Sequence, residues 1–479
     1  MRDKTKAQNA PSLELRPANE NPWYVLMTLY GDAYGKNRKV WNSWAAQVLT
    51  DEEKLAYEEL GKVDELTKWE TIRDEVELKF TYEFEKRNGP RARVPPIPDP
   101  NVSVRLSKLL ITSHLELESY VFPRGFYLSR SLCKGDVDFE DSIFLRACSV
   151  RKTTFEEDVM FLEVHFRKGM DFSGTVGGEA SFIASKFHGP ASFYDATFLG
   201  DVSFTQTEFS ELAIFLDSSF EKRSLFEFAR FRGRAKFHDV AFGKLGSEEV
   251  NFPSFLDCVF EKPTSFSQVR FLNAYPNFSG AILHEQTSFT ARRTPTESEV
   301  EANRNLEGAV YWPDQTLQDP EMAKKSCATI RHILSQQGLP EEEHSFYRKE
   351  MYFAGQIGSI GQRLPYLLFG LFSDYGYSIL RPTLWLAGLW ALGFVAFWGY
   401  LAGCCVPAPL DVVDRPMGTA MGLSFSNLFP LFGFGRTFLA AELAGLPAVL
   451  KVISGFQTVF SLPLLFFLGL GLRQRFRLR

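Results

Sequence analysis

Phenylalanine recurs along the middle of the chain at alternating steps of five and six residues. Five residues separate Phe182 from Phe187, and six separate Phe187 from Phe193. The residue two positions before each Phe is small or β-branched, and most other positions are polar or charged. A period this regular is typical of a repeat array. The positions that keep it are Phe182, Phe187, Phe193, Phe198, Phe204, Phe209, Phe215, Phe220, Phe226, Phe231, Phe237 and Phe242.

This spacing predicts a solenoid. Side chains two residues apart in an extended segment point to the same side, so each unit sends a small residue and a Phe inward together. A helix would need apolar residues at steps of three and four, and a single strand would need alternation over a longer run. Short extended sides joined by corners fit steps of five and six. Because no side can bury its Phe alone, successive coils must stack, with Phe ladders in the middle.

These units resemble pentapeptide-repeat proteins in the variant centred on Phe. The resemblance rests on Ala180-Ser-Phe182, Ala196-Thr-Phe198, Asp201-Val-Ser-Phe204 and Ala235-Lys-Phe237. It implies a mainly β fold, a right-handed quadrilateral β-helix, which we place at residues 101–292. Gly177, Gly178 and residues 244–253 interrupt the rhythm, and we expect loops that bulge from a corner there. Ser149 stands where a Phe is expected.

The first hundred residues predict a tail, a small helical domain and a linker. Residues 1–20 are polar, so we expect a disordered tail without a cleavable signal peptide. Residues 21–100 carry helical patterns, with Thr50 and Glu53 spaced as a capping box, and end in a stiff Pro-rich linker. Since a solenoid must cover its ends, we expect this domain to cap the first coil.

Residues 293–378 predict a helical connector. Asp319-Pro320 is a strong helix start, because an N-cap residue precedes Pro at the first helical position, and Gly338 is expected to end that helix. Another helix is expected to begin near Pro340. Residues 364–372 are apolar and lead into Ser373-Asp-Tyr-Gly376, which predicts a segment lying in a membrane interface.

Residues 379–479 predict a two-span α-helical membrane domain. Residues 382–410 contain no charge, and about 20 apolar residues suffice to cross a bilayer. We predict spans at about 383–403 and 452–472. The intervening segment, at about 418–438, is rich in Gly, Ser and Pro. A re-entrant half-helix tolerates such residues where it is buried in protein or lines water. Three full spans are the alternative.

Basic residues on both sides of the predicted spans favour an even number of crossings. Arg348, Lys349, Arg363 and Arg381 precede the first span, and four arginines follow the last. The positive-inside rule then puts both ends in the cytosol. Four short motifs are similar to a membrane-bound bacterial branch of pentapeptide-repeat proteins, which implies a multi-pass inner-membrane protein with a cytosolic β-helix: Asn21-Pro-Trp-Tyr24, Ser373-Asp-Tyr-Gly376, Arg381-Pro382 and Leu472-Arg-Gln-Arg-Phe476.

The candidate functional residues lie in the re-entrant segment: Ser424, Ser426, Asn427, Pro430, Gly433, Phe434 and Gly435. The order of span, loop and span resembles potassium-channel-like proteins, in which backbone carbonyls replace the ion's hydration shell and glycine permits the required backbone. Pro430, Leu431 and Phe432 stand where that family has threonines, which argues against potassium selectivity. A hairpin that only packs the spans, or forms an oligomer contact, is the alternative.

No catalytic, cofactor or metal site is predicted, and we expect no enzyme. No nucleophile has a base and an orienting group nearby in a recognisable motif. His188 and His238 follow inward Phe residues and should point outward, and the run Glu156-Glu157-Asp158 is read as a solvated corner. The six cysteines lack metal-ligand spacing and are read as small apolar residues in a reducing compartment: Cys133, Cys148, Cys258, Cys327, Cys404 and Cys405.

The charge balance argues against a nucleic-acid partner. The chain carries a net charge of −5, without a basic footprint. Between Phe139 and Phe289 there are 15 Lys plus Arg and 21 Asp plus Glu, a difference of −6. Some pentapeptide-repeat proteins imitate DNA and bind topoisomerase. A DNA mimic needs a continuous acidic surface, and in the sequence four basic residues interrupt the acidic ones: Arg230, Arg232, Arg234 and Lys236.

Two functions of different classes follow. The first is a channel-like homo-oligomer in the lipid bilayer, in which the cytosolic β-helix binds an unknown protein or ligand and regulates the pore. The second is a non-conducting scaffold that is anchored in the membrane and presents a rigid binding wall. A pore needs a closed ring of subunits, whereas a scaffold can act as a monomer.

Overall fold

The computed structural model describes residues 14–58, 68–244, 249, 251–291, 311–313, 318–403 and 415–476. The chain forms two compact units, Met1–Phe346 and Tyr347–Arg479. The first thirteen residues of the expected tail, the polar segment after Phe289, and Cys404 with Cys405 lie outside the described residues.

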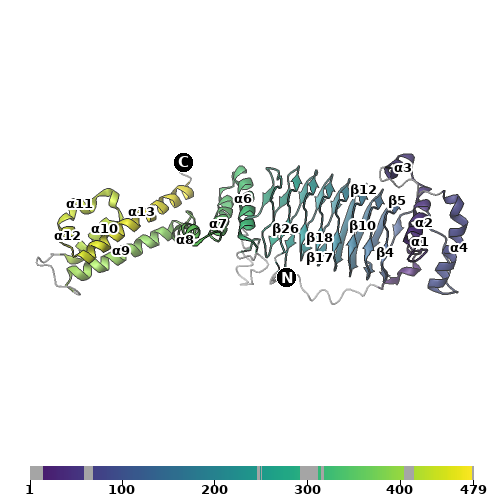
Figure 1. Ribbon diagram of the computed structural model, residues 1–479, viewed down its shortest axis with the longest axis horizontal. Helices are drawn as coiled ribbons and strands as arrows, with labels where there is room; N and C mark the ends of the chain where they lie inside the picture. Colours follow the sequence, from purple (N-terminus) through teal and green to yellow (C-terminus); the bar gives the residue numbers. More distant parts are fainter. Residues whose placement is uncertain are drawn as a thin grey trace. The chain divides into compact units, whose positions relative to one another are not determined.

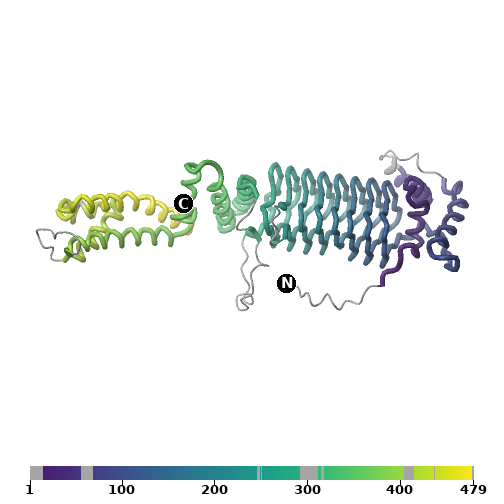
Figure 2. Tube along the Cα trace, turned by 60° about the horizontal axis from the view of Figure 1, so that its bottom comes forward, coloured from purple at the N-terminus to yellow at the C-terminus, as the bar shows by residue number. Residues whose placement is uncertain are grey.

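The first unit is built around a parallel β-solenoid (Figures 1 and 2). Its coils have four sides, each formed by a short stretch of strand. This confirms the mainly β solenoid. Strand partners recur after 22 residues, as from Leu115 to Val137 and on to Val159. Each strand pairs with its equivalent in the next coil, so backbone groups on one coil are satisfied by the next one.

Three sheets form the four sides of the coil. The first seven-stranded sheet contains β4 (Leu115–Glu116), β8 (Val137–Asp138), β11 (Val159–Met160), β14 (Ala180–Ser181), β18 (Val202–Ser203), β22 (Ser224–Leu225) and β26 (Pro253–Ser254). The second contains β5 (Val121–Phe122), β9 (Ile143–Phe144), β12 (His165–Phe166), β15 (Lys186–Phe187), β19 (Glu208–Phe209), β23 (Arg230–Phe231) and β27 (Val259–Phe260).

A 16-stranded sheet makes the other two sides, because its two longest strands, β10 (Cys148–Phe155) and β13 (Met170–Val176), run across both of them. Its other strands are β1 (Arg16–Pro17), β2 (Val104–Arg105), β3 (Leu109–Ile111), β6 (Phe126–Ser129), β7 (Leu132–Cys133), β16 (Ala191–Ser192), β17 (Thr197–Phe198), β20 (Ala213–Ile214), β21 (Ser219–Phe220), β24 (Ala235–Lys236), β25 (Ala241–Phe242), β28 (Ser265–Phe266), β29 (Arg270–Phe271) and β30 (Ser288–Phe289).

The Phe residues of the repeat form the core. All twelve that define the rhythm are at most 1% exposed. Along the first sheet the ring centroids of Phe182, Phe204, Phe226 and Phe255 follow one another at 4.8, 4.9 and 4.9 Å, with nearly parallel planes. This is the spacing of neighbouring strands, so strand pairing and ring stacking reinforce one another.

Three local predictions differ from the structure. Val150 rather than Ser149 takes the inward position, because Val150 pairs with Phe172 while Ser149 pairs with Asp171. Gly177 and Gly178 do not bulge. A Cβ at 177 would lie 2.7 Å from the Glu156 carbonyl oxygen, so these glycines allow a tight corner in a coil one residue shorter than its two neighbours. Arg16–Pro17, placed in the expected tail, forms β1 because it pairs with β3.

Helices cover the first coil. They are η2 (Ala18–Glu20), α1 (Pro22–Met27), α2 (Tyr34–Ala46), α3 (Asp51–Glu58) and α4 (Trp69–Asn88). Trp41 on α2 is fully buried and donates its indole N–H to the Val121 carbonyl at 2.8 Å. Thr50 and Glu53 make both bonds of the predicted capping box. The open strand edge is thereby closed.

At the other end of the solenoid Trp312 stacks on Phe271, with ring centroids 4.6 Å apart, and Phe346 meets Trp312 edge-on. Two helices follow, α6 (Pro320–Gln336) and α7 (Pro340–Ala354). The α6 helix begins as predicted, with the Asp319 side chain accepting from the Glu321 N–H and Pro320 at the first position. Gly338 follows its end with φ +70°.

The second unit is helical. It contains α8 (Ile360–Ser373), α9 (Leu380–Leu401), α10 (Pro416–Leu428), η5 (Pro430–Phe432), α11 (Phe434–Phe438), α12 (Ala440–Gly445) and α13 (Ala448–Phe476). By length and composition, α9 and α13 are each apolar and long enough to cross a membrane, and they correspond to the two predicted spans. The 13 residues of α10 give a rise of about 20 Å, less than the thickness of a bilayer core.

Candidate functional site

The α10 helix runs back along α9. Ala420 and Leu423 pack with Phe397 near the end of α9, whereas Leu428 packs with Leu386 near its beginning. Helix α13 begins beside the same end of α9, where Leu450 joins the cluster around Phe397. The end of α9 and the start of α13 therefore lie at one end of the helical unit, and α10 enters from that end.

The segment after α10 returns to the end from which α10 entered. A Cβ placed on Gly435 would lie 2.9 Å from the Ser426 hydroxyl, and one on Gly422 would lie 3.5 Å from the Leu439 side chain. Further along, Leu446 packs against the cluster that holds Ala420. Residues 416–446 thus form a helical hairpin, which we call the α10 hairpin, and both of its ends lie at the same end of the unit.

A buried polar cluster fastens this hairpin to the two long helices. Gln457 on α13 has no exposed surface and donates to the Leu389 carbonyl at 2.7 Å and to the Ser424 hydroxyl at 2.9 Å. Its side-chain oxygen accepts from the Asn427 amide at 3.0 Å. Ser454 donates to the Asn427 side-chain oxygen at 3.1 Å. We call the side chains of Ser424, Asn427, Ser454 and Gln457 the Gln457 cluster. In this cluster the polar side chains of α10 are hydrogen-bonded to side chains of α13.

The other residues of the predicted site are dispersed along the hairpin. Ser426 donates to the Leu423 carbonyl within its own helix at 2.8 Å. Pro430 begins η5, Gly433 takes a left-handed conformation with φ +65°, and Phe434 begins α11 with 45% of its surface exposed. Because η5, α11 and α12 occupy most of the return, the described part of the hairpin lacks the extended row of carbonyls that lines a selectivity filter.

Two members of this arrangement were not found from the sequence. Gln457 lies in the second predicted span, where Ser454, Gln457 and Ser461 share one face of α13, and Gln457 and Ser461 are fully buried. Gly393 on α9 accommodates it, since a Cβ there would lie 1.9 Å from the Gln457 amide nitrogen. The signal was available, because a glutamine with serines three before and four after it marks one face of a helix.

The outer faces of the solenoid segregate charge in a way that the linear sequence conceals. Outward positions along the first seven-stranded sheet form what we call the acidic wall, on which Arg223 is the one Lys or Arg among the described residues. It carries twelve carboxylates: Glu116, Glu118, Asp136, Asp138, Glu140, Asp141, Asp158, Glu163, Glu179, Asp201, Glu227 and Asp257. Burial, followed by repulsion from Asp138, raises the pKa of Glu140.

The basic residues expected to interrupt this surface lie elsewhere. Arg230 belongs to β23 in the second sheet, where Arg232 pairs with Glu208 at 2.8 Å, and Lys236 belongs to β24 in the 16-stranded sheet. The acidic wall is therefore nearly continuous. These basic residues therefore do not argue against an acidic binding surface on this wall.

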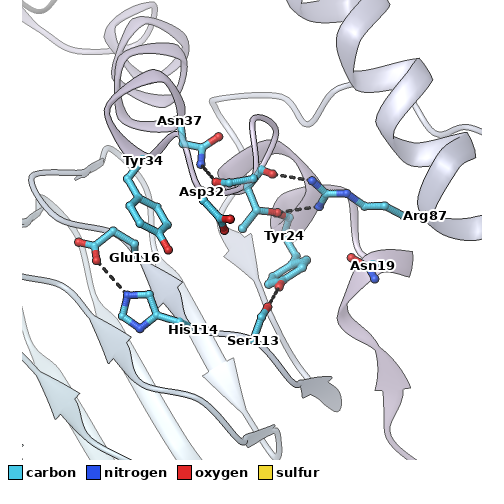
Figure 3. Close-up of a pocket in the computed structure, with 11 residues that line it drawn as sticks. Asn19, Tyr24, Asp32, Tyr34, Asn37, Arg87, Ser113, His114 and Glu116 are labelled. Carbon is cyan, nitrogen blue, oxygen red and sulfur yellow. Dashed lines mark hydrogen bonds and ion pairs between the residues drawn. The ribbon is translucent and has the colours of Figure 1, made fainter.

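The helical cap and the solenoid meet around a polar pocket of about 190 Å³ (Figure 3). Arg87 on α4 donates to the Thr28 hydroxyl at 2.7 Å, Tyr24 bonds the Ser113 hydroxyl at 2.9 Å, and Asn37 donates to the Gly31 carbonyl at 2.8 Å. The Tyr24–Ser113 bond connects the cap to the solenoid, whereas the other two bonds lie within the cap. In the described part of the chain no group of three or more His, Cys, Asp or Glu side chains could hold a metal ion.

The fold and its repeat define a class, the four-sided parallel β-solenoids with a Phe core. Comparison with known families agrees, because pentapeptide repeats (9 copies) match residues 128–176 and 182–230. The solenoid of this chain thus contains pentapeptide repeats. No curated protein and no solved structure matches the chain.

Proposed function

We propose that this protein is a scaffold anchored in a lipid bilayer, whose solenoid offers its acidic wall to a basic protein partner. The α9 and α13 helices supply the anchor. The solenoid and the C-terminal arginines lie in the cytosol. A pentapeptide-repeat solenoid suits a binding role, because it is rigid and presents one side chain at each coil.

Exposed apolar side chains support insertion into a bilayer. On α9 the exposed fractions of Leu384, Leu392 and Val395 are 60%, 58% and 61%, and on α13 those of Val452 and Phe466 are 71% and 66%. Continuous apolar surface of this kind is rare on water-soluble monomers. Lipid chains would cover it without any other partner.

The Gln457 cluster is the observation that favours the scaffold function over the pore function. A pore lining needs groups that face water, whereas Ser424 and Asn427 bond to Gln457 in a site with almost no exposed surface. An internal network of this kind fixes helix packing. The α10 hairpin is therefore interpreted as a structural wedge between the spans.

The second candidate is a channel-like homo-oligomer, and the path of the α10 hairpin favours it. A half-helix that enters and leaves at one end, between two spans, is the arrangement of a pore loop. Leu431, Phe432 and Phe438 on the hairpin are 82%, 69% and 74% exposed. In a ring of subunits these side chains would form the contacts between copies.

Ion flux through liposomes that carry the purified chain separates the two functions. The scaffold predicts no flux above that of empty liposomes, with insertion verified by resistance to alkaline extraction. Flux that scales with protein and disappears in Gly433→Val would favour the pore instead. Gly433 suits this test because no atom lies within 4 Å of an added Cβ, although its φ of +65° disfavours any side chain.

Cross-linking in intact cells tests the acidic wall. A photoreactive residue at Met160, which pairs with Asp138 of the preceding coil, should capture a basic protein, and Asp136→Asn with Asp158→Asn should reduce the capture. The matched control is Asp195→Asn with Asp217→Asn, at the corners between strands of the 16-stranded sheet. Equal capture by both double variants would refute the acidic wall as the binding surface.

A further inference from the structure

The α8 helix lies at the end of the helical unit where α9 begins and α13 finishes. Phe369 on α8 contacts Phe467 on α13, with ring centroids 5.5 Å apart, and Phe372 contacts Trp385 on α9 at 5.2 Å. A Cβ on Gly376 would lie 2.7 Å from Leu470. This end is opposite to the one from which the α10 hairpin enters.

One face of α8 has no protein neighbour to cover it in the described unit. Ile360, Leu364, Leu367, Leu368 and Leu371 follow at helical spacing and are 85%, 50%, 58%, 40% and 53% exposed. The opposite face carries the aromatic residues that pack on α9 and α13. With 14 residues, α8 rises about 21 Å and is too short to cross a bilayer. An apolar stripe on such a helix suits the boundary between headgroups and acyl chains.

Charge is concentrated at the same end. Residues 347–381 contain Arg348, Lys349, Arg363 and Arg381 against Glu350 and Asp374, and four more arginines follow residue 472. Residues 402–451, which connect the other ends of α9 and α13, contain three basic and three acidic residues. In the sequence, residues 347–381 and 473–479 together carry a net charge of +6, whereas residues 402–451 carry a net charge of zero.

A turn fixes two of these arginines beside α8. Asp374 follows the helix in a left-handed conformation, φ +53°, and its carboxylate accepts from Arg348 at 2.9 Å and lies 3.4 Å from Arg381. Arg381 also donates to the Gly370 carbonyl at 2.8 Å and keeps half of its side chain exposed. One carboxylate faces two guanidinium groups, so these three side chains beside α8 have a net positive charge.

We propose that α8 lies in the plane of the membrane interface and that the arginines around it bind the phosphate groups of anionic lipids. The inference rests on the proposed anchoring in a bilayer. The exposed stripe supplies the apolar contact, and the basic residues of the described segments 347–381 and 473–476 supply the charge complementarity. Removing one Arg near an anionic surface should weaken lipid binding about fivefold.

The test uses the full-length chain in lipid nanodiscs of phosphatidylcholine alone or with a titrated fraction of phosphatidylglycerol. Hydrogen exchange of the amides in residues 360–373 reports the seating of α8. We expect exchange to slow as phosphatidylglycerol increases, and to recover at high salt. Arg363→Gln with Arg473→Gln should shift the required phosphatidylglycerol fraction at least tenfold, whereas Arg415→Gln with Lys451→Gln at the other end should not shift it.

The outcomes separate this proposal from the anchoring on which it rests. Exchange that is equal in both lipids, in a chain that enters both discs, would overturn anionic-lipid binding and leave the anchor intact. A chain that enters neither disc would overturn both. Inorganic phosphate added to phosphatidylcholine discs is the control for the source of the phosphate. If it alone slows exchange to the same extent, the site binds free phosphate and the lipid proposal is wrong.

Discussion

Replacement of Gln457 by Ala should loosen the helical unit by breaking the Gln457 cluster. The change removes three hydrogen bonds, to Leu389, Ser424 and Asn427. If the helices lie in a bilayer as proposed, each hydrogen bond is worth about 0.6 kcal/mol, which gives about 2 kcal/mol. The side chain is fully buried, so lost packing adds about 1 kcal/mol. We therefore expect a loss of about 3 kcal/mol in the free energy of unfolding.

Equilibrium unfolding in mixed micelles of mild detergent and dodecyl sulfate, followed by helical circular dichroism, measures this loss. Val459→Ala is the matched control, because Val459 is two residues away and 64% exposed. It should change the free energy of unfolding by at most about 0.5 kcal/mol. A Gln457→Ala variant that unfolds together with the control would refute the idea that the cluster holds the hairpin.

Gly393 provides a stricter test of the same geometry. A Cβ there would lie 1.9 Å from the Gln457 amide, so Gly393→Ala should destabilise the wild-type chain. In the Gln457→Ala background the added methyl group meets no amide, and the same substitution should cost far less. Additive effects of the two substitutions would show that they do not share a contact.

Three further predictions concern the solenoid. Phe204→Ala should lower the free energy of unfolding by about 3–5 kcal/mol because it leaves a cavity in a stacked ladder, whereas Phe228→Asn, at an exposed left-handed corner, should change it by less than about 1 kcal/mol; thermal unfolding compares them. Burial, with nearby positive charge, lowers the pKa of His165 from 6.5 to about 4, so the unfolded chain binds the extra proton first, and stability should fall as the pH drops from 6.5 towards 4. His165→Gln should lack that slope in denaturant titrations. Trp41→Phe removes the bond to the Val121 carbonyl, and faster hydrogen exchange in the first coil should follow without a change in the central coils.

The interior of the solenoid could be predicted from the sequence because the repeat restricts it. A Phe at every fifth or sixth residue has one way to be buried, and all twelve predicted ladder positions are buried. The wrong predictions inside the solenoid occur where one coil is a residue shorter than the repeat. The register near Ser149 and the corner at Gly177 and Gly178 depend on a coil of 21 residues, from Val159 to Ala180, that no local pattern reveals.

The Gln457 cluster is a contact of another kind. Asn427 and Gln457 are 30 residues apart and lie on separate helices. Hydrophobic periodicity predicts that two spans exist, but not which polar side chains meet between them, since that depends on helix rotation and on the depth of the hairpin. Ser424 and Asn427 were functional candidates because they lie in the predicted re-entrant segment, which resembles a pore loop between two spans. Their role became visible only with their partner.

The acidic wall shows why a charge count along the chain predicts a surface poorly. Asp136, Asp158 and Glu179 are separated by 22 and 21 residues, yet they are successive neighbours: the Asp158 N–H donates to Asp136 at 3.2 Å, and the Glu179 N–H to Asp158 at 2.6 Å. Arg230 and Arg232, which lie among acidic residues in the sequence, face another side. In a solenoid the residues that share a surface are one coil apart, so charge must be summed down the walls. Summed in that way, a chain with a net charge of −5 contains one wall with twelve carboxylates.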